Sequence, residues 1–280
     1  MKKIKKQELI KLYVTQKKAS NEISKIWKTS PRYVTKLRHK YNILTLNSIA
    51  RLSIPKKLYK KQKQVLYGVL LSDGHIRIDS RYPKVMFSQA VLPGHTEFFN
   101  YVVKILGSYA TRICIRKRFS KLTNKDRYQH IFVTHCHPVF MQAYKDFVYN
   151  NKKRLSTNIF SKEIFTPLML AVWFMGDGSN SKGRIKLSTH SFTYKEHLMM
   201  KRVFKKFFNI NIIICKHNYL TKPTHISSSK EKYSIRLLRH DSRVFINLVK
   251  PYVVKEMSYK LFLPSNYKKK NNRKNNYVNR

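Results

Sequence analysis

Two stretches of the sequence, LYGVLLSDG at residues 66–74 and LAVWFMGDG at residues 170–178, share one pattern. Each is an apolar run that leads directly into an Asp-Gly pair, which contains Asp73 in the first stretch and Asp177 in the second. The similarity continues after both pairs, with an alternating strand-like segment followed by an amphipathic helical segment. Two copies of so long a unit indicate an internal duplication with a pseudo-two-fold axis.

The matching segments define the expected order of elements. VMFSQ (85–89) matches IKLSTH (185–190), HTEFFNYVVKIL (95–106) matches YKEHLMMKRVFKKF (194–207), and PVFMQAYKDFVYNNKK (138–153) matches RVFINLVKPYVVKEMSYK (243–260). Each copy therefore predicts helix, two strands, helix, two strands, helix, which is an α+β fold. We expect a helical segment over 1–52, a linker over 53–61, modules over 62–158 and 159–264, and a basic disordered tail over 265–280.

The composition indicates a polyanionic partner. The chain has 280 residues, 59 of them Lys or Arg and 13 Asp or Glu, for a net charge of +46. Such a field attracts nucleic acid, and an anionic membrane surface is the weaker alternative. The best apolar run, Pro167–Met175, is too short to span a bilayer, and the charged N-terminus does not resemble a signal peptide. Three cysteines without a CxxC pair argue against a disulfide framework.

The residue usage bears on location. The sequence is rich in Lys, Asn, Ile and Tyr, which is typical of an AT-rich coding genome. We therefore expect a protein of an organellar matrix, encoded in a mitochondrion or plastid, or one from the cytoplasm of an AT-rich organism.

Residues 1–52 show a separate helical pattern. Apolar positions recur at helical spacing, and Ser30-Pro31 is a good helix start because Ser caps and Pro fits the first turn. A short helix, a tight connection and a capped basic helix predict a helix-turn-helix, with Arg32, Lys36 and Arg38 facing DNA. The alternative is a three-helix cap with solvated charges.

The Asp-Gly pairs carry the expected chemistry. An Asp at the C-terminal end of an apolar helix faces the negative end of the helix dipole, so a compensating cation is expected there. Gly68 and Ser72 on one helix, and Gly176 on the other, are small enough for two helix backbones to approach closely. Asp73 and Asp177 would then lie side by side and offer oxygen ligands to Mg²⁺. The alternative is a pair of Asp-Gly hairpin turns.

Taken together, VLYGVLLSDGHI, TPLMLAVWFMGDGS, FSQ (87–89), NNKK (150–153), LSTHSFT (187–193) and VKPYVVKEMSYKL (249–261) resemble the double-motif LAGLIDADG homing endonucleases. The resemblance extends over about 200 residues, from Lys61 to Leu263. It implies two αββαββα modules that form an antiparallel saddle of strands astride DNA. It also implies cleavage of both strands that depends on Mg²⁺ or Mn²⁺.

The resemblance also implies roles for single residues. Asp73 and Asp177 match the metal-binding acids, and Lys153 and Lys260 match basic residues that support each active site. Gln89 matches a polar residue that orders water near the metal, and His190 stands at the corresponding place where the family more often has Gln. Without the resemblance, either lysine reads as a phosphate contact or a solvated charge.

A second cluster, formed by His135, Cys136 and His137, is a poor candidate for zinc. Adjacent side chains on a strand point to opposite faces, and no second cluster is nearby to complete about four ligands. We expect a strand end that leads into a helix near Pro138.

The strands between the helices are the expected DNA-reading surface, because Arg reads guanine bidentately and Lys holds phosphates. The candidates are Arg77, Arg81, Lys84, Arg112, Arg116 and Arg118 in the first module and Lys182, Arg184, Lys186, Arg236 and Arg239 in the second.

Three functions fit these observations. The leading one is a site-specific, Mg²⁺-dependent endonuclease acting on double-stranded DNA, monomeric because one chain holds both halves. The second is an intron maturase that binds RNA on the same scaffold. The third is a DNA-binding regulator with an inactive endonuclease body, which the intact acids and lysines disfavour.

Overall fold

The structure is a computed structural model that describes residues 4–43, 54–79, 81–92, 95–120, 124–217 and 232–263. The chain divides into two compact units, Met1–Lys56 and Lys57–Arg280. The predicted tail over 265–280 lies outside the described residues. So do residues 44–53, which connect the first unit to the predicted linker.

The first unit is a small bundle of helices around one apolar core. It contains α1 (Lys6–Ile10), which continues as a π-helical turn (Lys11–Thr15), α2 (Ser20–Ile26) and α3 (Pro31–Lys40). The Ser30 hydroxyl accepts a hydrogen bond from the Tyr33 backbone N–H at 3.2 Å, so the predicted cap is present. Leu9, Ile23 and Val34 are fully buried in its core, whereas Ile26 on α2 is 52% exposed.

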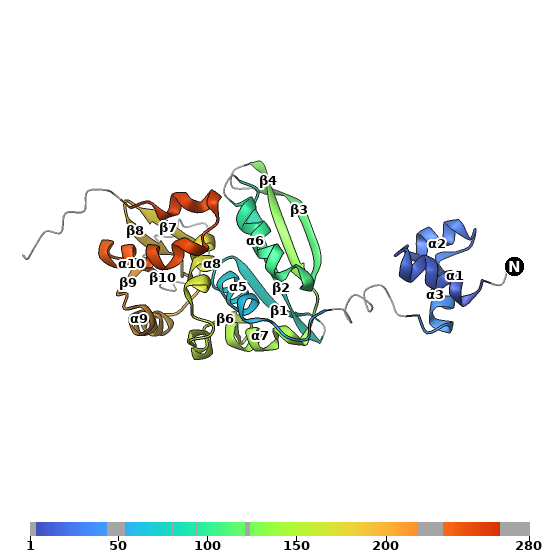
Figure 1. Cartoon of the computed structure of the whole chain (residues 1–280), viewed down its shortest axis with the longest axis horizontal. Coiled ribbons are helices and arrows are strands. Elements are labelled where there is room, and N and C mark those ends of the chain that lie inside the picture. Colours follow the sequence, from blue (N-terminus) through green and yellow to red (C-terminus); the bar gives the residue numbers. More distant parts are fainter. Residues whose placement is uncertain are drawn as a thin grey trace, which may run out of the picture. The chain divides into compact units, whose positions relative to one another are not determined.

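The second unit repeats one order of elements twice. The first copy has α5 (Lys60–Leu71), β1 (Gly74–Asp79), β2 (Tyr82–Ala90), α6 (Thr96–Leu106), β3 (Ala110–Ser120), β4 (Lys125–Thr134) and α7 (Met141–Phe147). The second has α8 (Pro167–Asp177), β7 (Gly178–Ser181), β8 (Arg184–Leu187), α9 (Tyr194–Phe208), β9 (Ile212–His217), β10 (Lys232–Leu237) and α10 (Arg239–Val249). Both copies are αββαββα, as the duplication predicts (Figure 1).

The two copies end differently. After α7 the first copy forms a small hairpin of β5 (Val148–Tyr149) and β6 (Lys152–Lys153). After α10 the second copy forms a C-terminal 3₁₀ helix, Lys255–Leu261. These two different structures occupy corresponding places in the repeat.

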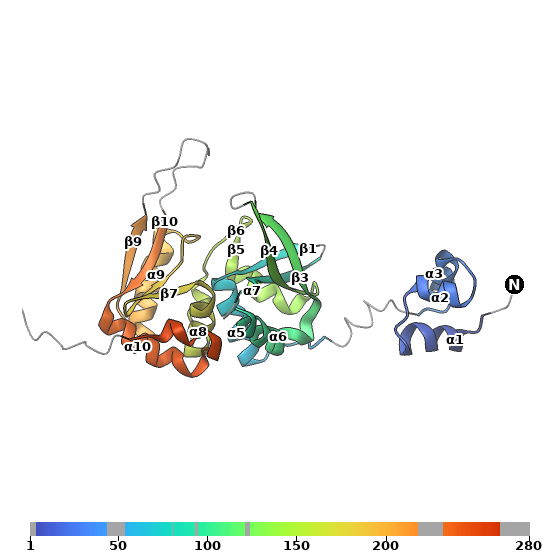
Figure 2. The ribbon, with the colours of Figure 1, turned by 90° about the horizontal axis from the view of Figure 1, so that it is seen from above.

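Each copy contributes one antiparallel four-stranded sheet. The strand orders are β1-β2-β4-β3 and β7-β8-β10-β9, which are equivalent under the duplication. The registers also match, because Gly74 pairs with Phe87 in the first sheet and Gly178 pairs with Leu187 in the second. Figure 2 shows the sheets on either side of the helices α5 and α8, with the β3–β4 and β9–β10 hairpins projecting to the same side.

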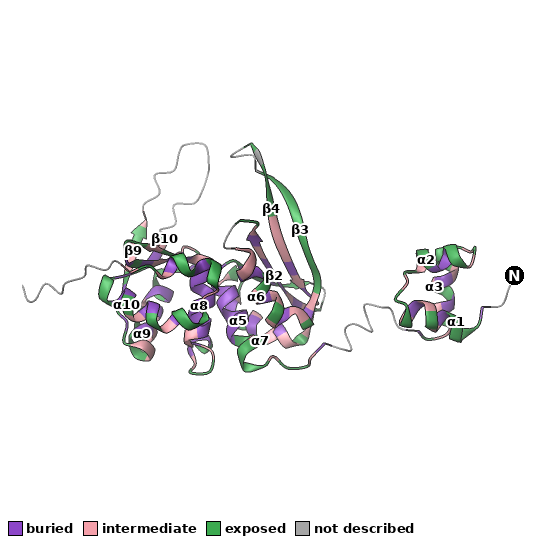
Figure 3. Cartoon of the chain, turned by 45° about the horizontal axis from the view of Figure 1, so that its top comes forward, coloured by how far each residue is buried: buried purple, intermediate pink, exposed green. Residues whose placement is uncertain are grey.

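Helices α5 and α8 pack against each other at the centre of this unit, and their facing residues are buried (Figure 3). Equivalent positions meet across the axis. A Cβ on Gly68 would lie 2.7 Å from the Val172 Cβ, and a Cβ on Gly176 would lie 2.5 Å from the Ser72 Oγ. Each contact therefore has one glycine, which allows the close approach that the small residues predict.

Within the described residues, every helix is too short or too polar to cross a membrane.

Candidate active site and nucleic-acid interface

The two helix ends bring Asp73 and Asp177 together, although in different settings. Helix α5 ends at Leu71, so Asp73 follows it in a turn and is exposed. Asp177 is the last residue of α8 and is partly buried. Burial, and after it the nearby Asp73, raise the pKa of Asp177 to about 6 against the lowering effect of Lys153 and Lys260. The carboxylates and the lysines therefore form one electrostatic cluster.

Each lysine reaches the C-terminal end of its own module's helix. Lys153, on β6, donates to the Ser72 carbonyl oxygen at 3.1 Å. Lys260, on the C-terminal 3₁₀ helix, donates to the Met175 carbonyl oxygen at 2.7 Å. Backbone carbonyls at a helix end have no partner within the helix and attract cations. The α5 and α8 ends thus hold a positive charge beside each acid.

The lysines are buried enough to lose part of their basicity. Burial lowers the pKa of Lys260 to about 8, and Asp73 and Asp177 oppose that shift. Burial also lowers the pKa of Lys153, with Asp177 and Asp73 again opposing it. The acids of both modules therefore act on each lysine.

Carboxylates from one module also fix the segments that carry the lysines of the other. Glu196, near the start of α9, accepts a hydrogen bond from the Leu155 backbone N–H at 2.6 Å. Glu97, near the start of α6, accepts one from the Glu256 backbone N–H at 2.7 Å. No local pattern in the sequence marks these glutamates as site residues. The feature that could have identified them is their position near the start of equivalent helices, in a chain with few acids.

Gln89 lies beside Asp73, and its side-chain amide N–H donates to the Asp73 carboxylate. On its other side, Gln89 Oε1 lies 2.8 Å from His95 Nδ1. His95 is a site residue that sequence reasoning missed, because a histidine just before an amphipathic helix has no distinctive pattern.

The match of His190 to Gln89 is off by one residue. Gly74 pairs with Phe87 and Gly178 pairs with Leu187, so Phe87 and Leu187 are equivalent. The residues two positions further on, Gln89 and Thr189, are therefore counterparts. His190 instead lies against His217, with ring centroids 5.1 Å apart. Burial lowers the pKa of His190, and the charges that act on it are those of His217, Lys186, Lys232 and His197 rather than Asp177. Counted from their first residues, the segments VMFSQ (85–89) and IKLSTH (185–190) also set Gln89 against Thr189, so the match to His190 skipped one residue.

The donor set fits a hard divalent cation. Among the described residues no group of three or more His, Cys, Asp or Glu side chains could hold a metal ion, so the protein offers the two carboxylates. Burial is the main cause of the raised pKa of Asp177 and the nearby Asp73 the second, so a cation bound beside the two acids would favour the ionised carboxylate. Oxygen ligands with open positions suit Mg²⁺, which binds through few carboxylates and keeps waters or phosphate oxygens.

The basic residues predicted on the first sheet share one face. Val85, Phe87 and Phe132 are buried on the side of the helices. By alternation and strand pairing, the opposite face carries Arg77, Lys84, Arg112, Arg116 and Arg118. A hollow of about 590 Å³ on this face is lined by both Asp73 and the two arginines Arg116 and Arg118.

Two first-sheet candidates have local partners that the sequence did not indicate. Lys84 forms an ion pair with Asp79 on the neighbouring strand, which reduces the free charge of this region. Arg81 lies in the turn before β2, with its guanidinium 5.8 Å from the centroid of the Tyr82 ring.

The second sheet has fewer of its predicted cations on the corresponding face. Lys186 pairs directly with Arg236, and Arg184 shares their face. Lys182 lies in the β7–β8 turn with a φ of 50°. Arg239 was expected on a strand, but it is the first residue of α10, because β10 ends at Leu237.

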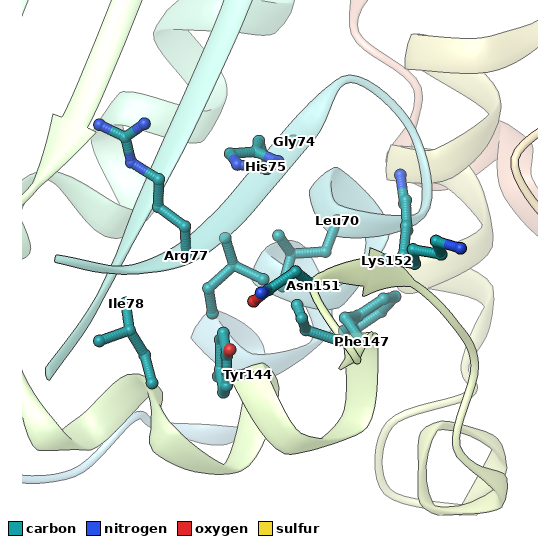
Figure 4. Close-up of a pocket in the computed structure, with 12 residues that line it drawn as sticks. Leu70, Gly74, His75, Arg77, Ile78, Tyr144, Phe147, Asn151 and Lys152 are labelled. Atoms are coloured by element: carbon teal, nitrogen blue, oxygen red, sulfur yellow. The ribbon is translucent and has the colours of Figure 1, made fainter.

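A smaller cavity of about 220 Å³ opens beside Lys153, between β1, α7 and the β5–β6 hairpin (Figure 4). Its lining combines an apolar floor with a basic rim and includes Leu70, His75, Ile76, Arg77, Ile78, Tyr144, Phe147, Asn151 and Lys152. The cavity extends the positively charged surface around the first module's half of the site.

The segment His135–His137 is structural, as expected. The His137 backbone N–H donates to the Pro83 carbonyl oxygen at 3.0 Å, and its Nδ1 accepts from the Val139 backbone N–H at 3.2 Å. His137 therefore caps the 3₁₀ turn Pro138–Phe140 that follows β4.

In the first unit, two of the three predicted DNA contacts are exposed. Arg32 and Lys36 lie on the solvent side of α3. Arg38 instead donates to the Ile43 carbonyl oxygen at 3.2 Å and lies over the Tyr13 ring, so it supports the bundle. The helix-turn-helix stays a prediction.

Comparisons with known proteins identify the family and the fold of the chain. The profile of the LAGLIDADG DNA endonuclease family matches residues 63–242. The intron-encoded endonuclease ai4 of Dictyostelium discoideum is 30% identical over 171 residues, covering 59% of this chain and 96% of that protein. The cytochrome b mRNA maturase bI2 of Debaryomyces hansenii is 25% identical over 211 residues, covering 74% of this chain and 75% of that protein.

A solved structure of the homing endonuclease I-WcaI, bound to its DNA recognition sequence, shares the fold. The TM-score is 0.67 at 24% identity, with 79% of this chain and 94% of that chain covered. Endonucleases of this family depend on divalent metal ions, and the paired carboxylates here suit such an ion. The chain therefore belongs to the LAGLIDADG DNA endonuclease family.

Proposed function

We propose that the chain is a site-specific homing endonuclease that cuts both strands of a long, asymmetric DNA target, as a monomer with one site at its pseudo-two-fold axis. The observation that carries this proposal is the meeting of Asp73 and Asp177 at the ends of α5 and α8, beside the partly buried Lys153 and the buried Lys260. Two modules of different surface chemistry suit a target whose two halves differ in sequence.

The outer faces of the two sheets are the proposed DNA seat. Arg112, Arg116 and Arg118 on β3 would contact one half of the target, and Arg184, Lys186 and Arg236 the other. Arg side chains in the major groove read guanine, whereas Lys side chains mainly neutralise phosphates. The hollow that Asp73, Arg116 and Arg118 line supports this proposal, because a phosphate backbone held by the two arginines would lie close to the acid.

The residues present support hydrolysis of phosphodiester bonds. Asp73 and Asp177 would hold Mg²⁺ or Mn²⁺, which when bound neutralises phosphate charge and lowers the pKa of a water. Lys153 and Lys260 would stabilise the negative charge that develops on each phosphate in the transition state. Because burial lowers the pKa of Lys260 to about 8, part of its population is neutral near that pH and could accept a proton from the attacking water.

The test replaces each acid. Asp73→Asn and Asp177→Asn should each slow double-strand cleavage by about two to three powers of ten, while binding persists. Binding should persist because the change removes negative charge facing phosphate. Cleavage is measured with Mg²⁺ and binding with Ca²⁺, on the intronless allele of the host gene. Asp126→Asn, at an exposed acid on β4, is the matched control. Full cutting by either acid variant would refute the assignment.

A second candidate function is intron RNA splicing, because one relative is a cytochrome b mRNA maturase. Splicing of the host intron with and without the protein tests this function. Asp73→Asn separates the two activities, because a maturase role needs no cleavage and would survive the substitution.

We further propose that the protein is intron-encoded and acts in the organelle that holds its host gene, as the names of the relatives suggest. An intron around the coding sequence, inserted at the cleavage position, would support this placement.

A further inference from the structure

Gln89 forms a bridge between Asp73 and His95. Its side chain is 4% exposed, its amide N–H donates to the Asp73 carboxylate, and its Oε1 lies 2.8 Å from His95 Nδ1. His95 is the residue that precedes α6, so its backbone is anchored by that helix. The bridge thus joins the end of β2, the start of α6 and the acid after α5.

The chemistry of the amide fixes the direction of both hydrogen bonds. A carboxylate accepts only, so the NH₂ group of Gln89 must face Asp73, and Oε1 must face His95. Oε1 also only accepts, so His95 must donate from Nδ1. A rotation of the amide by 180° would set two oxygens against each other. His95 is therefore the group that opposes this rotation.

The second module offers an internal comparison. Thr189, the counterpart of Gln89, has its hydroxyl 2.7 Å from His197 Nε2. Thr is too short to bridge onward, and among the described residues no side-chain hydrogen bond to the Asp177 carboxylate is found. A histidine thus meets the residue at this equivalent position in both modules, but only in the first does that contact continue to an acid.

We propose that His95 is a positioning residue, which locks the amide of Gln89 and thereby holds the Asp73 carboxylate in one orientation for the reaction. This inference rests on the proposed function, in which Asp73 takes part in cleavage. The competing explanation is that His95 only stabilises the junction of β2 and α6. The two explanations differ in what they predict for the rate of the bound complex.

The first test is single-turnover cleavage of the prebound target. His95→Ala should slow cleavage about tenfold, as is usual for residues that orient a metal-ligating carboxylate, with affinity in Ca²⁺ unchanged. His95→Asn should recover most of the rate, because the Asn amide N–H can replace Nδ1. In a Gln89→Ala background, His95→Ala should cause no further loss. His197→Asn, the matched control, should lower thermal stability and keep the rate.

A wild-type rate for His95→Ala, or losses that multiply in the double variant, would overturn the proposal. If the His95→Ala variant does not fold, the proposal is tested by the single-turnover rates of His95→Asn and Gln89→Ala. The proposal requires these two rates to differ. If the wild-type protein cuts no DNA, the proposed function fails separately, and the second test still applies.

The second test reads the tautomer of His95 in the free protein, without cleavage. Nitrogen NMR of ¹⁵N-histidine-labelled protein should show His95 protonated on Nδ1, with its signal assigned by its loss in His95→Asn. Free neutral imidazole favours protonation on Nε2, so the hydrogen bond must select this form. Gln89→Ala should shift His95 toward the Nε2 form. An Nε2–H tautomer in the wild-type protein would contradict the proposal.

Discussion

The first and second modules share an axis and differ around it. In the first, an exposed Asp73 bonds to Gln89, and the supporting lysine lies on a two-residue strand. In the second, a partly buried Asp177 ends α8, and the lysine lies on a 3₁₀ helix. The reading faces also differ, because Arg112 and Arg116 on β3 correspond in register to Ile213 and His217 on β9.

The difference shows which features the duplication must keep. The contacts of Gly68 with Val172 and of Ser72 with Gly176 allow the close approach of the two helices, so each contact needs a glycine on only one of them. The lysine needs only to reach a helix end, so two different local structures can deliver it. An asymmetric DNA target then requires the faces to diverge. Each prediction below tests one part of this comparison.

Among the substitutions that distinguish the two modules, the largest effect is expected from the lysines. Lys153→Met and Lys260→Met should each slow one strand's cleavage by about a hundredfold and the other strand's much less, because each lysine serves one helix end. The two variants should spare opposite strands. Strand-labelled substrate in a single-turnover assay resolves the nicked intermediates. If either variant slowed the cleavage of both strands equally, the two lysines would not each support the cleavage of one strand.

The helix contacts come next. Gly176→Ala should cost about 1–3 kcal/mol from overpacking against the Ser72 side chain, which corresponds to a drop of roughly 5 °C in Tm. Adding Ser72→Gly should restore Tm, because the nearest obstacles are Ser72 atoms.

Gly68→Ala is the matched control for that rescue. Its Cβ would lie 2.8 Å from the Met169 carbonyl oxygen as well as against Val172. Val172→Gly should therefore fail to restore Tm. Rescue in both pairs, or in neither, would contradict the geometry of this helix interface.

A smaller effect concerns pH in the absence of divalent metal. The pKa of Asp177 rises from 3.8 to about 6 on folding, so its protonated form is favoured in the folded state. The stabilising contribution is fully present below pH 4 and is lost as pH rises through about 6. The Tm of the wild-type protein, minus that of Asp177→Asn, should therefore fall between pH 4 and 6. A flat difference would place Asp177 in a less buried setting.

The smallest effect is expected from the first unit. If α3 contacts DNA, Arg32→Ala and Lys36→Ala should each reduce the log–log salt slope of binding by about 0.9. Arg38→Ala should lower the Tm of the first unit, because Arg38 bonds to the Ile43 carbonyl oxygen. Unchanged slopes for both exposed cations would show that this unit is not a DNA contact.

The sequence predicted the features that repeat. The apolar runs before Asp73 and Asp177, and the Ser30-Pro31 start, depend on local periodicity and capping, so the helices could be placed in advance. The His190 match failed because it stood one residue out of register with Gln89, and the pairing of Gly178 with Leu187 makes Thr189 the counterpart. The roles of Glu196 and His95 depend on contacts between distant segments, which no local pattern encodes.

The central claim is that Asp73 and Asp177 act as one shared site, and strand-resolved cleavage by Asp73→Asn and Asp177→Asn tests it most directly. With both strands labelled and the target prebound, the account predicts that each variant loses cleavage of both strands, because each buried lysine is under the influence of both acids. A variant that cuts one strand at the wild-type rate and spares the other would contradict this, since it would mean two independent sites.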